Sequence, residues 1–378
     1  MKPKDVRGLI SAVVLGFFVA GCGETRDAAP GSTPASKSPT GVGTTTPGVP
    51  APIFTLAWSE YPSWSVFGVA SDRGLIDGKK GKLGRLEEKW GVDIELQLLQ
   101  YEPCITAYQS KASDAVCITN MDVLNPALSR KSVAIMPTST SNGADACIVA
   151  GIPDLKELRK HKVYGLPESV SQYAFVRCLE IKGEKELDYQ YSQMDPEKAA
   201  QAMQAKAAGI DAIMVWNPFV LQTLKSRRDA KVLFDSSLIP EEIIDMVVVG
   251  NDVLDRPKGK EFACAVIDTY YEFNKMLADH TERDSLLVAL GEKFSSLNRD
   301  EMEKAVTQTR FYKTPQEGLE LYTGKKFRAT MSRILDFYVS RRIIKGTPPT
   351  LGFDGDQGAA LAQLRFDPSF IRIVQERK

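Results

Sequence analysis

Short apolar runs alternate with segments of helical pattern from Ile53 to about residue 249, and this alternation restricts the fold more than any other feature of the chain. The runs IFTLAW (53–58), VDIELQLL (92–99) and AVCIT (115–119) are rich in β-branched or other apolar residues and predict buried strands. Strands and helices that alternate with short connections form α/β folds with largely parallel sheets. Further strands are predicted at residues 132–138, 145–150, 162–166, 188–194, 211–216, 231–235 and 245–249.

The alternating pattern falls into two blocks, residues 53–148 and residues 149–245. Each block is long enough to form a lobe with its own core. The chain after Asp252 is mostly helical in pattern, and a turn-rich tail begins at Gly346. We therefore expect a first lobe that starts in residues 53–148, a second lobe at 149–245, and a return at 246–378 that completes the first lobe.

One helix has clear end signals. Asp195 precedes Pro196, a favoured first residue of a helix, and Asp is a favoured residue just before a helix. The alanine-rich run that follows reaches Gly209, which is predicted to end the helix.

The N-terminus carries the pattern of an exported protein. Three basic side chains in the first seven residues precede Leu9–Ala20, an apolar stretch too short to span a bilayer as a stable helix. The residues VAGC (19–22) resemble the lipobox of bacterial lipoproteins. That resemblance implies a lipoprotein signal peptide at residues 1–21, cleavage before Cys22, and acyl chains on Cys22 that attach the protein to a membrane in the periplasm or at the cell surface.

Residues 22–52 are rich in Ala, Gly, Ser, Thr and Pro and contain almost no large apolar side chain. Such a segment cannot bury enough surface to offset its chain entropy. We expect it to be a flexible linker between the lipid anchor and the folded part.

The charges of the chain balance, with 48 lysines and arginines against 48 aspartates and glutamates. A neutral total gives no sign of a nucleic-acid partner. No segment after the signal peptide reaches the roughly 18 continuous apolar residues of a membrane span. We expect no second membrane anchor.

The chain has six cysteines, and Cys22 is one of them. The wide and irregular spacing of the other five suggests neither a disulfide framework nor a zinc site. Cys117, Cys147 and Cys264 lie in apolar runs and are predicted to be small buried hydrophobic residues. The sequence leaves open whether one disulfide forms.

Motifs of catalysis are missing from the sequence. There is no Gly-x-Ser-x-Gly elbow and no His-Glu-x-x-His metal motif, and the only histidines are His161 and His280. We expect a protein without enzymatic activity, cofactor or metal.

Polar and aromatic side chains follow the predicted strands, at the edge where open α/β sheets bind ligands. A cleft lined by aromatic rings, hydroxyls, amides and a few carboxylates suits a small polar organic molecule. The scarcity of Lys and Arg at these positions favours a neutral or cationic ligand that is rich in N–H groups. The candidate ligand-binding residues are Trp58, Glu60, Tyr61, Trp64, Asn120, Asp122, Ser141, Asn142, Glu168, Ser169, Ser171, Trp216, Asn217 and Asp245.

Several of these residues have a structural alternative. Trp58 and Trp64 could belong to the core. Asn120 and Asp122 could cap the following helix, and the pair 168–169 could cap another, because acids and hydroxyls favour helix starts.

Segments across the first 250 residues resemble the periplasmic solute-binding proteins of nitrate/sulfonate/taurine-type ABC importers, and more narrowly the branch encoded beside urea carboxylase genes. The segments that carry the resemblance are LAWSEYPSWSVFGVA (56–70), CITNMDVLNP (117–126), STSNGADACIVAG (139–151), LPESVSQYAFVRCLE (166–180), MVWNPFV (214–220) and FDSSLIPEEIIDMVVVG (234–250), with a fainter echo at LRFDPSFI (364–371).

The resemblance implies a two-lobed periplasmic-binding-protein fold (type II-like) with two crossover strands and a helical C-terminal region. It implies a monomer that binds a small molecule and delivers it to the permease and ATPase subunits of an importer. For this branch the implied ligand is urea-like or guanidine-like. A thiamine-pyrimidine precursor, nitrate or a sulfonate are the alternatives, and so is a sensor that reports its ligand to a membrane receptor.

Overall fold

The computed structural model describes residues 50–294 and 297–377 of the chain, within a unit that runs from Pro50 to Lys378. The predicted signal peptide, the lipidation site Cys22 and the linker up to residue 49 lie outside the described residues. In the described ranges no helix combines the length and apolar character that crossing a membrane requires.

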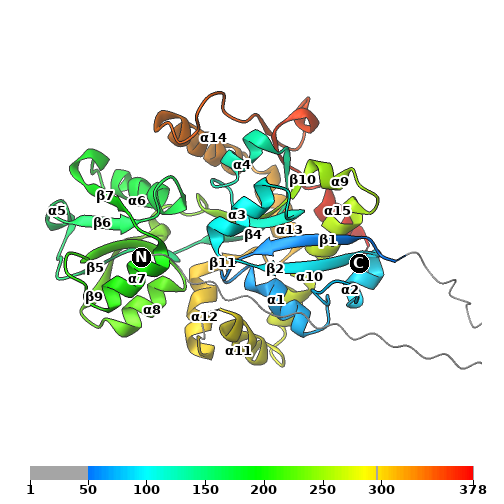
Figure 1. Ribbon diagram of the computed structural model, residues 1–378, viewed down its shortest axis with the longest axis horizontal. Helices are drawn as coiled ribbons and strands as arrows, with labels where there is room; N and C mark the ends of the chain where they lie inside the picture. The colour runs from blue at the N-terminus through cyan, green and yellow to red at the C-terminus, as the bar shows by residue number, and fades with distance from the viewer. Residues whose placement is uncertain (1–49, 295–296, 378) are drawn as a thin grey trace, which may run out of the picture. The chain divides into compact units, whose positions relative to one another are not determined.

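The larger of two sheets has eight strands and lies on the right in Figure 1. Its order is β12-β13-β4-β10-β3-β1-β2, and β11 pairs with β4 beside this path. The pairs β1–β2, β1–β3, β12–β13 and β13–β4 are parallel, whereas β10 and β11 run antiparallel to their neighbours. The strands span β1 Ile53–Trp58, β2 Asp93–Leu98, β3 Ala115–Thr119, β4 Ser132–Ser141, β10 Ile244–Gly250, β11 Thr309–Phe311, β12 Leu351–Gly352 and β13 Leu364–Phe366.

The second sheet has five strands in the order β7-β6-β8-β5-β9 and lies on the left in Figure 1. Strand β6 is parallel to β7 and β8, and β5 is antiparallel to β8 and β9. The strands span β5 Asp145–Ala150, β6 Lys162–Gly165, β7 Gln190–Gln193, β8 Ala212–Trp216 and β9 Ala230–Asp235.

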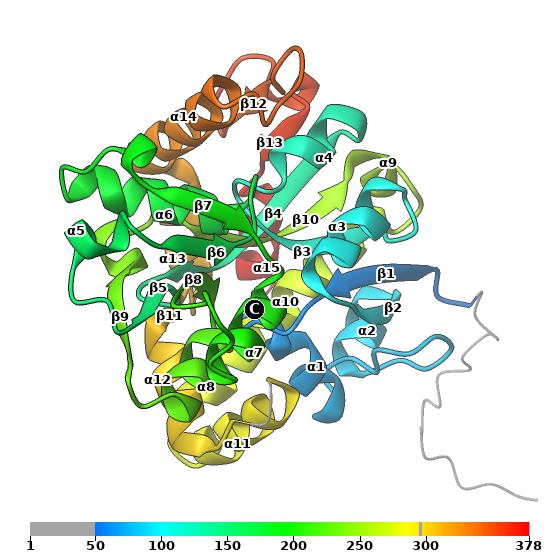
Figure 2. The same ribbon diagram turned by 60° about the vertical axis from the view of Figure 1, so that its left-hand side comes forward.

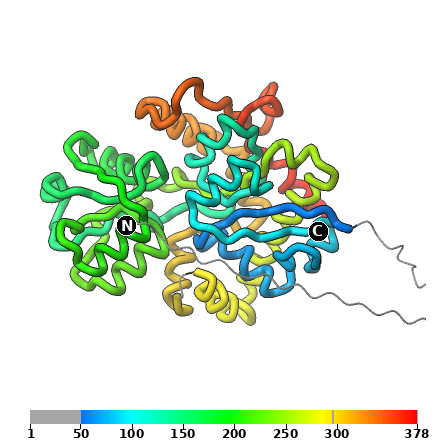
Figure 3. Tube along the Cα trace, viewed as in Figure 1, coloured from blue at the N-terminus to red at the C-terminus, as the bar shows by residue number. Residues whose placement is uncertain are grey.

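The chain crosses between the two sheets at two short connections, which Figure 3 lets the reader trace. The first leads from β4 to β5 and the second from β9 to β10. Each strand that follows a crossing is antiparallel to both of its neighbours: β5 to β8 and β9, and β10 to β3 and β4. Both sheets are therefore mixed, and the expectation of largely parallel sheets was wrong at β5, β10 and β11. The expected lobe boundary between residues 148 and 149 falls inside β5, all of which pairs within the second sheet.

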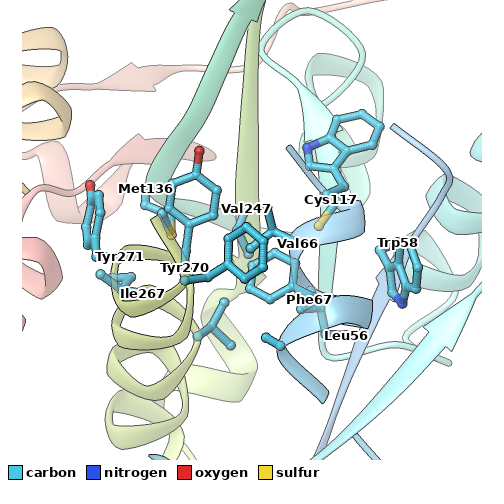
Figure 4. Close-up of a cluster of buried hydrophobic side chains, with 14 of the residues drawn as sticks. Leu56, Trp58, Val66, Phe67, Cys117, Met136, Val247, Ile267, Tyr270 and Tyr271 are labelled. Atoms are coloured by element: carbon cyan, nitrogen blue, oxygen red, sulfur yellow. The ribbon is translucent and has the colours of Figure 1, made fainter. Parts of the chain in front are cut away.

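The central strands of the first sheet are buried on both faces, so their apolar runs are nearly continuous. Successive side chains point to opposite faces. Phe54 and Leu56 of β1 enter one core, whereas Ala57 of the same strand enters the other. Figure 4 shows part of the first core, where Leu56 and Trp58 lie near Phe67.

Helices cover both faces of the sheets (Figure 2). On the first sheet α1 and α2 contact α10, whereas α3 packs on β3. In the second sheet α6 and α7 contact β8. The α-helices span α1 Ser65–Asp72, α2 Arg85–Trp90, α3 Tyr101–Gln109, α4 Leu124–Ser129, α5 Leu155–Leu158, α6 Val170–Ile181, α7 Pro196–Gln204, α8 Phe219–Ser226, α9 Asn251–Leu254, α10 Gly259–Ala278, α11 Arg283–Lys293, α12 Arg299–Gln308, α13 Pro315–Thr323, α14 Lys325–Ser340 and α15 Ser369–Glu376.

Helix α7 begins as its sequence predicts but ends early. The carboxylate of Asp195 accepts hydrogen bonds from the backbone N–H groups of Glu197 and Lys198, which confirms it as the cap. The helix ends at Gln204, because the chain turns through a left-handed residue at Lys206. The predicted end at Gly209 is wrong, since Gly209 uses its positive φ in the turn before β8.

The C-terminal tail is part of the first sheet. Strand β13 pairs with β4, and α15 packs against α10 and α13. The five cysteines between residues 104 and 264 are all free and buried, which confirms the prediction for Cys117, Cys147 and Cys264.

Candidate functional site

A hollow of about 280 Å³ lies where the ends of the strands of the two sheets meet. The first sheet supplies residues from the β1–α1 loop, the start of α3, the end of β3 and the start of β10. The second supplies residues from the start of β5, the start of α6 and the end of β8. The hollow is lined by Tyr61, Trp64, Tyr101, Thr119, Asp145, Val170, Trp216, Ile243 and Asp245.

Four aromatic rings in this lining form a chain of contacts from the first sheet to the second. The centroids of Tyr61 and Trp64 are 4.8 Å apart, and Trp64 stacks on Tyr101 at 5.6 Å with an interplanar angle of 13°. Tyr101 meets Trp216 edge to face at 5.8 Å. Such ring faces attract cations and cover planar groups.

Two carboxylates face the hollow, one from each sheet. Asp145 opens β5 and is 2 % exposed, and Asp245 near the start of β10 is 1 % exposed. Asp245 accepts a hydrogen bond of 2.5 Å from the Ser139 hydroxyl, which lies 2.8 Å from the hydroxyl of Ser63. The backbone N–H of Asp145 donates to the Ser141 hydroxyl at 3.2 Å.

Burial raises the pKa of both carboxyl groups. The pKa of Asp145 rises to about 7, against a slight lowering by a hydrogen bond from Ser141. For Asp245 burial is again the main cause, and the negative charge of Asp145 raises its pKa further. Burial and the same two carboxylates also raise the pKa of the Tyr61 hydroxyl.

A third carboxylate, Asp122, lies behind Tyr101. It accepts hydrogen bonds from the hydroxyls of Tyr101 at 2.8 Å and Tyr338 at 2.9 Å. Burial raises its pKa, and these two hydrogen bonds oppose the rise. Asp122 therefore fixes the ring of Tyr101 in the lining of the hollow.

No positive side chain neutralises these three carboxylates among the residues that the structure describes. Among the described residues, none of Asp122, Asp145 and Asp245 forms an ion pair. No Lys, Arg or His side chain contributes to the pKa of any of the three. The lining of the hollow contains no Lys, Arg or His. Since an unpaired buried carboxylate is costly, the site is electrostatically suited to a ligand that brings positive charge or N–H donors.

The structure brings four of the predicted residues together in this hollow, and four others line two neighbouring hollows. Glu60 lines a larger hollow of about 1000 Å³ that also touches Tyr101 and Trp216. Asp122 lines a hollow of about 640 Å³ on the other side of Tyr101 together with Glu168 and Ser169. The four predicted residues in the central hollow are Tyr61, Trp64, Trp216 and Asp245.

Four more predicted residues form hydrogen bonds at or near the two crossings between the sheets. The Asn120 side chain donates to the backbone oxygen of Glu242 and accepts from the backbone N–H of Ile244. The Ser141 hydroxyl lies 2.7 Å from that of Ser236, which joins the two crossings. The remaining two residues, Asn142 and Asn217, both bind Gln308 at the end of α12, Asn142 through its backbone N–H and Asn217 through its side chain.

The last predicted residues lie in the core, at the start of a helix or on the surface. Trp58 is buried in the core against α1, so that a Cβ at Gly68 would lie 2.9 Å from its ring. Ser169 caps α6 by accepting from the backbone N–H of Ser171, and the side chain of Ser171 is buried in the first turn. Glu168 is exposed, with a positive φ of 56°.

Sequence reasoning missed Tyr101 and Asp145. Tyr101 follows β2 after two residues, so the rule applied to the other strand ends would have found it. Asp145 stands at the start of a strand, not at its end. It reaches the site because β5 enters the second sheet directly from the crossing.

The described residues contain no group of three or more His, Cys, Asp or Glu side chains arranged to hold a metal ion.

The fold is that of the periplasmic binding proteins, with two α/β lobes. The structure is similar to the periplasmic aliphatic sulphonate-binding protein of Escherichia coli, with a TM-score of 0.61 and 16% identity over 78% of this chain and 89% of that chain. It is also similar to the periplasmic nitrate-binding protein of Synechocystis PCC 6803, with a TM-score of 0.59 and 10% identity over 86% of this chain and 88% of that chain.

A third similar structure is the ligand-binding component of an ABC-type import system from Staphylococcus aureus, with a TM-score of 0.61 and 13% identity over 85% of this chain and 98% of that chain. No protein-family model and no curated protein matches the sequence. At these identities the likeness establishes the two-lobed fold.

Proposed function

We propose that the chain is an extracytoplasmic solute-binding protein that delivers a small nitrogen-containing organic compound, of the urea or guanidine kind, to the permease and ATPase subunits of an ABC importer. The fold supports the binding role, because the similar structures include periplasmic binding proteins and a component of an import system. The predicted lipid on Cys22 would hold the protein at the membrane where the permease lies.

One observation carries the choice of ligand: Asp145 and Asp245 lie in an aromatic hollow that contains no basic residue. A planar guanidinium ion has N–H groups on several edges and can donate to both carboxylates at once. Its face can stack on Trp64 or Trp216, which adds a cation–π contribution. Its positive charge removes the cost of burying the carboxylates.

The same lining disfavours an anion. The names of the similar proteins mention sulphonate and nitrate, and both of these are anions. In this chain an anion would enter beside two carboxylates with no Lys or Arg in contact. The lining offers an anion no positive group, and the carboxylates repel it once they are ionised, so we expect neither anion to bind here.

Isothermal titration calorimetry of the full chain in detergent tests the proposal with guanidinium, urea, nitrate and ethanesulfonate. We expect guanidinium to bind most tightly, urea more weakly, and neither anion to bind. Asp245→Asn should abolish the preference for guanidinium over urea, whereas Asp284→Asn, an exposed aspartate of α11, should leave it unchanged. Tight binding of nitrate or ethanesulfonate without binding of guanidinium would refute the proposed ligand class.

A further inference from the structure

The larger hollow beside the acidic hollow has the features of a second ligand subsite. It holds about 1000 Å³ of space and shares Tyr101 and Trp216 with the acidic hollow, so the two adjoin at these rings. Residues of the first lobe form one wall and residues of α7 and α8 form the other. A ligand that occupied both hollows would pass beside these two rings, whose centroids are 5.8 Å apart.

The polar lining of this outer hollow consists largely of amides. Glutamine side chains both donate and accept hydrogen bonds, and the two glutamates accept them. None of the lining residues is Lys, Arg or His. One of the amides is held in place, since Gln201 Nε2 donates to Glu197 Oε1 at 3.1 Å. The acidic and amide residues are Glu60, Gln100, Glu197, Gln201, Gln204 and Gln222.

The two hollows differ in what they can hold. The acidic hollow, about 280 Å³ with its open side included, is much smaller than the outer hollow. Phe219 continues the aromatic wall from Trp216 into the outer hollow, with ring centroids 6.4 Å apart. That wall suits a short apolar linker, and the amides beyond it suit a group that forms hydrogen bonds.

From this arrangement we infer that the ligand is longer than guanidine or urea: its N–H-rich head lies between Asp145 and Asp245, and a hydrogen-bonding tail without negative charge lies among the glutamines of the outer hollow. The inference rests on the proposed function for the position of the head. The outer hollow has no basic side chain in its lining to pair with an anionic tail, and its glutamines and Glu197 favour an amide, hydroxyl or amine.

Calorimetry with four probes separates head from tail: guanidinium, butylguanidinium, guanidinobutanamide and guanidinobutanoate. The second probe adds the linker, the third adds a neutral amide, and the fourth replaces the amide with a carboxylate of similar size. The full chain in detergent is used throughout. We expect the amide to bind at least about fivefold more tightly than butylguanidinium, since a net hydrogen bond is worth about that factor. The carboxylate should bind more weakly than either.

The variants Gln201→Ala and Gln222→Ala test the tail residues one at a time. Each should reduce the affinity for guanidinobutanamide severalfold and leave the affinity for guanidinium unchanged. Gln316→Ala is a matched control, because this exposed glutamine of α13 also donates to a glutamate four residues away, Glu320, but lies outside the hollow. It should change neither affinity.

The outcomes separate the inference from the proposed function. If guanidinium binds but guanidinobutanamide binds no more tightly than butylguanidinium, the subsite is overturned and the proposed function stays intact. If guanidinobutanoate gains as much affinity over butylguanidinium as guanidinobutanamide does, the stated charge of the tail is overturned. Absence of binding by guanidinium and by all three longer probes overturns both.

Discussion

The sharpest consequence of the acidic hollow is a dependence of ligand binding on pH. Burial raises the pKa of Asp145 to about 7, whereas guanidinium keeps its charge at any pH near neutrality. A cation binds to the ionised carboxylate. We therefore expect the affinity for guanidinium to fall as the pH is lowered through about 7.

The size of the effect follows from the ionised fraction of Asp145. With a pKa of about 7, roughly nine-tenths of the carboxyl groups are ionised at about pH 8 and roughly one-tenth at about pH 6. If only the ionised form binds, the dissociation constant is about tenfold higher at about pH 6 than at about pH 8. Asp245 and Asp122, whose pKa values are also raised by burial, act in the same direction.

The free energy of unfolding without ligand should depend on pH in the opposite direction. The unfolded chain releases the proton of Asp145 near pH 4, but the native state keeps it up to about pH 7. Between these values the native state binds more protons, so the free energy of unfolding decreases as the pH rises. Added guanidinium should offset this loss, and most strongly above about pH 7.

Calorimetry at about pH 6, 7 and 8, in buffers with different ionisation enthalpies, measures both the affinity and the protons released on binding. We expect more protons to be released on binding at about pH 6 than at about pH 8. Asp145→Asn should weaken binding and flatten the pH dependence, and Asp284→Asn should change neither. An affinity that is constant over this range, or higher at about pH 6, would refute the role given to Asp145.

Three further predictions test other parts of the molecule. Trp216→Ala should weaken guanidinium binding about tenfold, the scale of a cation–π contact of 1–2 kcal/mol, and an unchanged dissociation constant would remove this ring from the site. Gly68→Ala should lower the free energy of unfolding in urea by about 1–3 kcal/mol, because the new methyl group would overlap the Trp58 ring, while the affinity for guanidinium stays the same. Cys22→Ala should abolish incorporation of labelled fatty acid and release the protein from the membrane fraction, and persistent labelling would show that the lipid is attached elsewhere.

The strands could be predicted because their physical signal is local. IFTLAW, AVCIT and DACIVA have the predicted bounds in the structure, since each is an apolar run buried on both faces. The direction of a strand is not local. Whether β5 runs parallel or antiparallel depends on a crossing between sheets, and no residue pattern within 145–150 records it.

The candidate site could be predicted in part for the same reason. Tyr61 and Trp216 lie at or just beyond the carboxyl ends of β1 and β8, and the rule for strand ends places them at the ligand edge. Asn120 lies at the corresponding end of β3, yet its side-chain amide forms hydrogen bonds with the backbone of the second crossing. Only the tertiary structure distinguishes a side chain that faces the hollow from one whose hydrogen bonds are already taken.

The origin of the two carboxylates connects ligand binding with movement of the lobes. Asp145 belongs to the second sheet and Asp245 to the first, so their repulsion would oppose close approach of the lobes wherever both are ionised and no cation lies between them. A cation between them converts this repulsion into two attractive contacts. A ligand shifts a conformational equilibrium only by its difference in affinity for the two states, and in the proposed function a closed state would add the second carboxylate to the contacts. A neutral ligand such as urea can donate hydrogen bonds to both groups but leaves their charges unbalanced. In the proposed function, a positively charged ligand therefore favours closure more strongly than a neutral ligand with the same hydrogen-bonding groups.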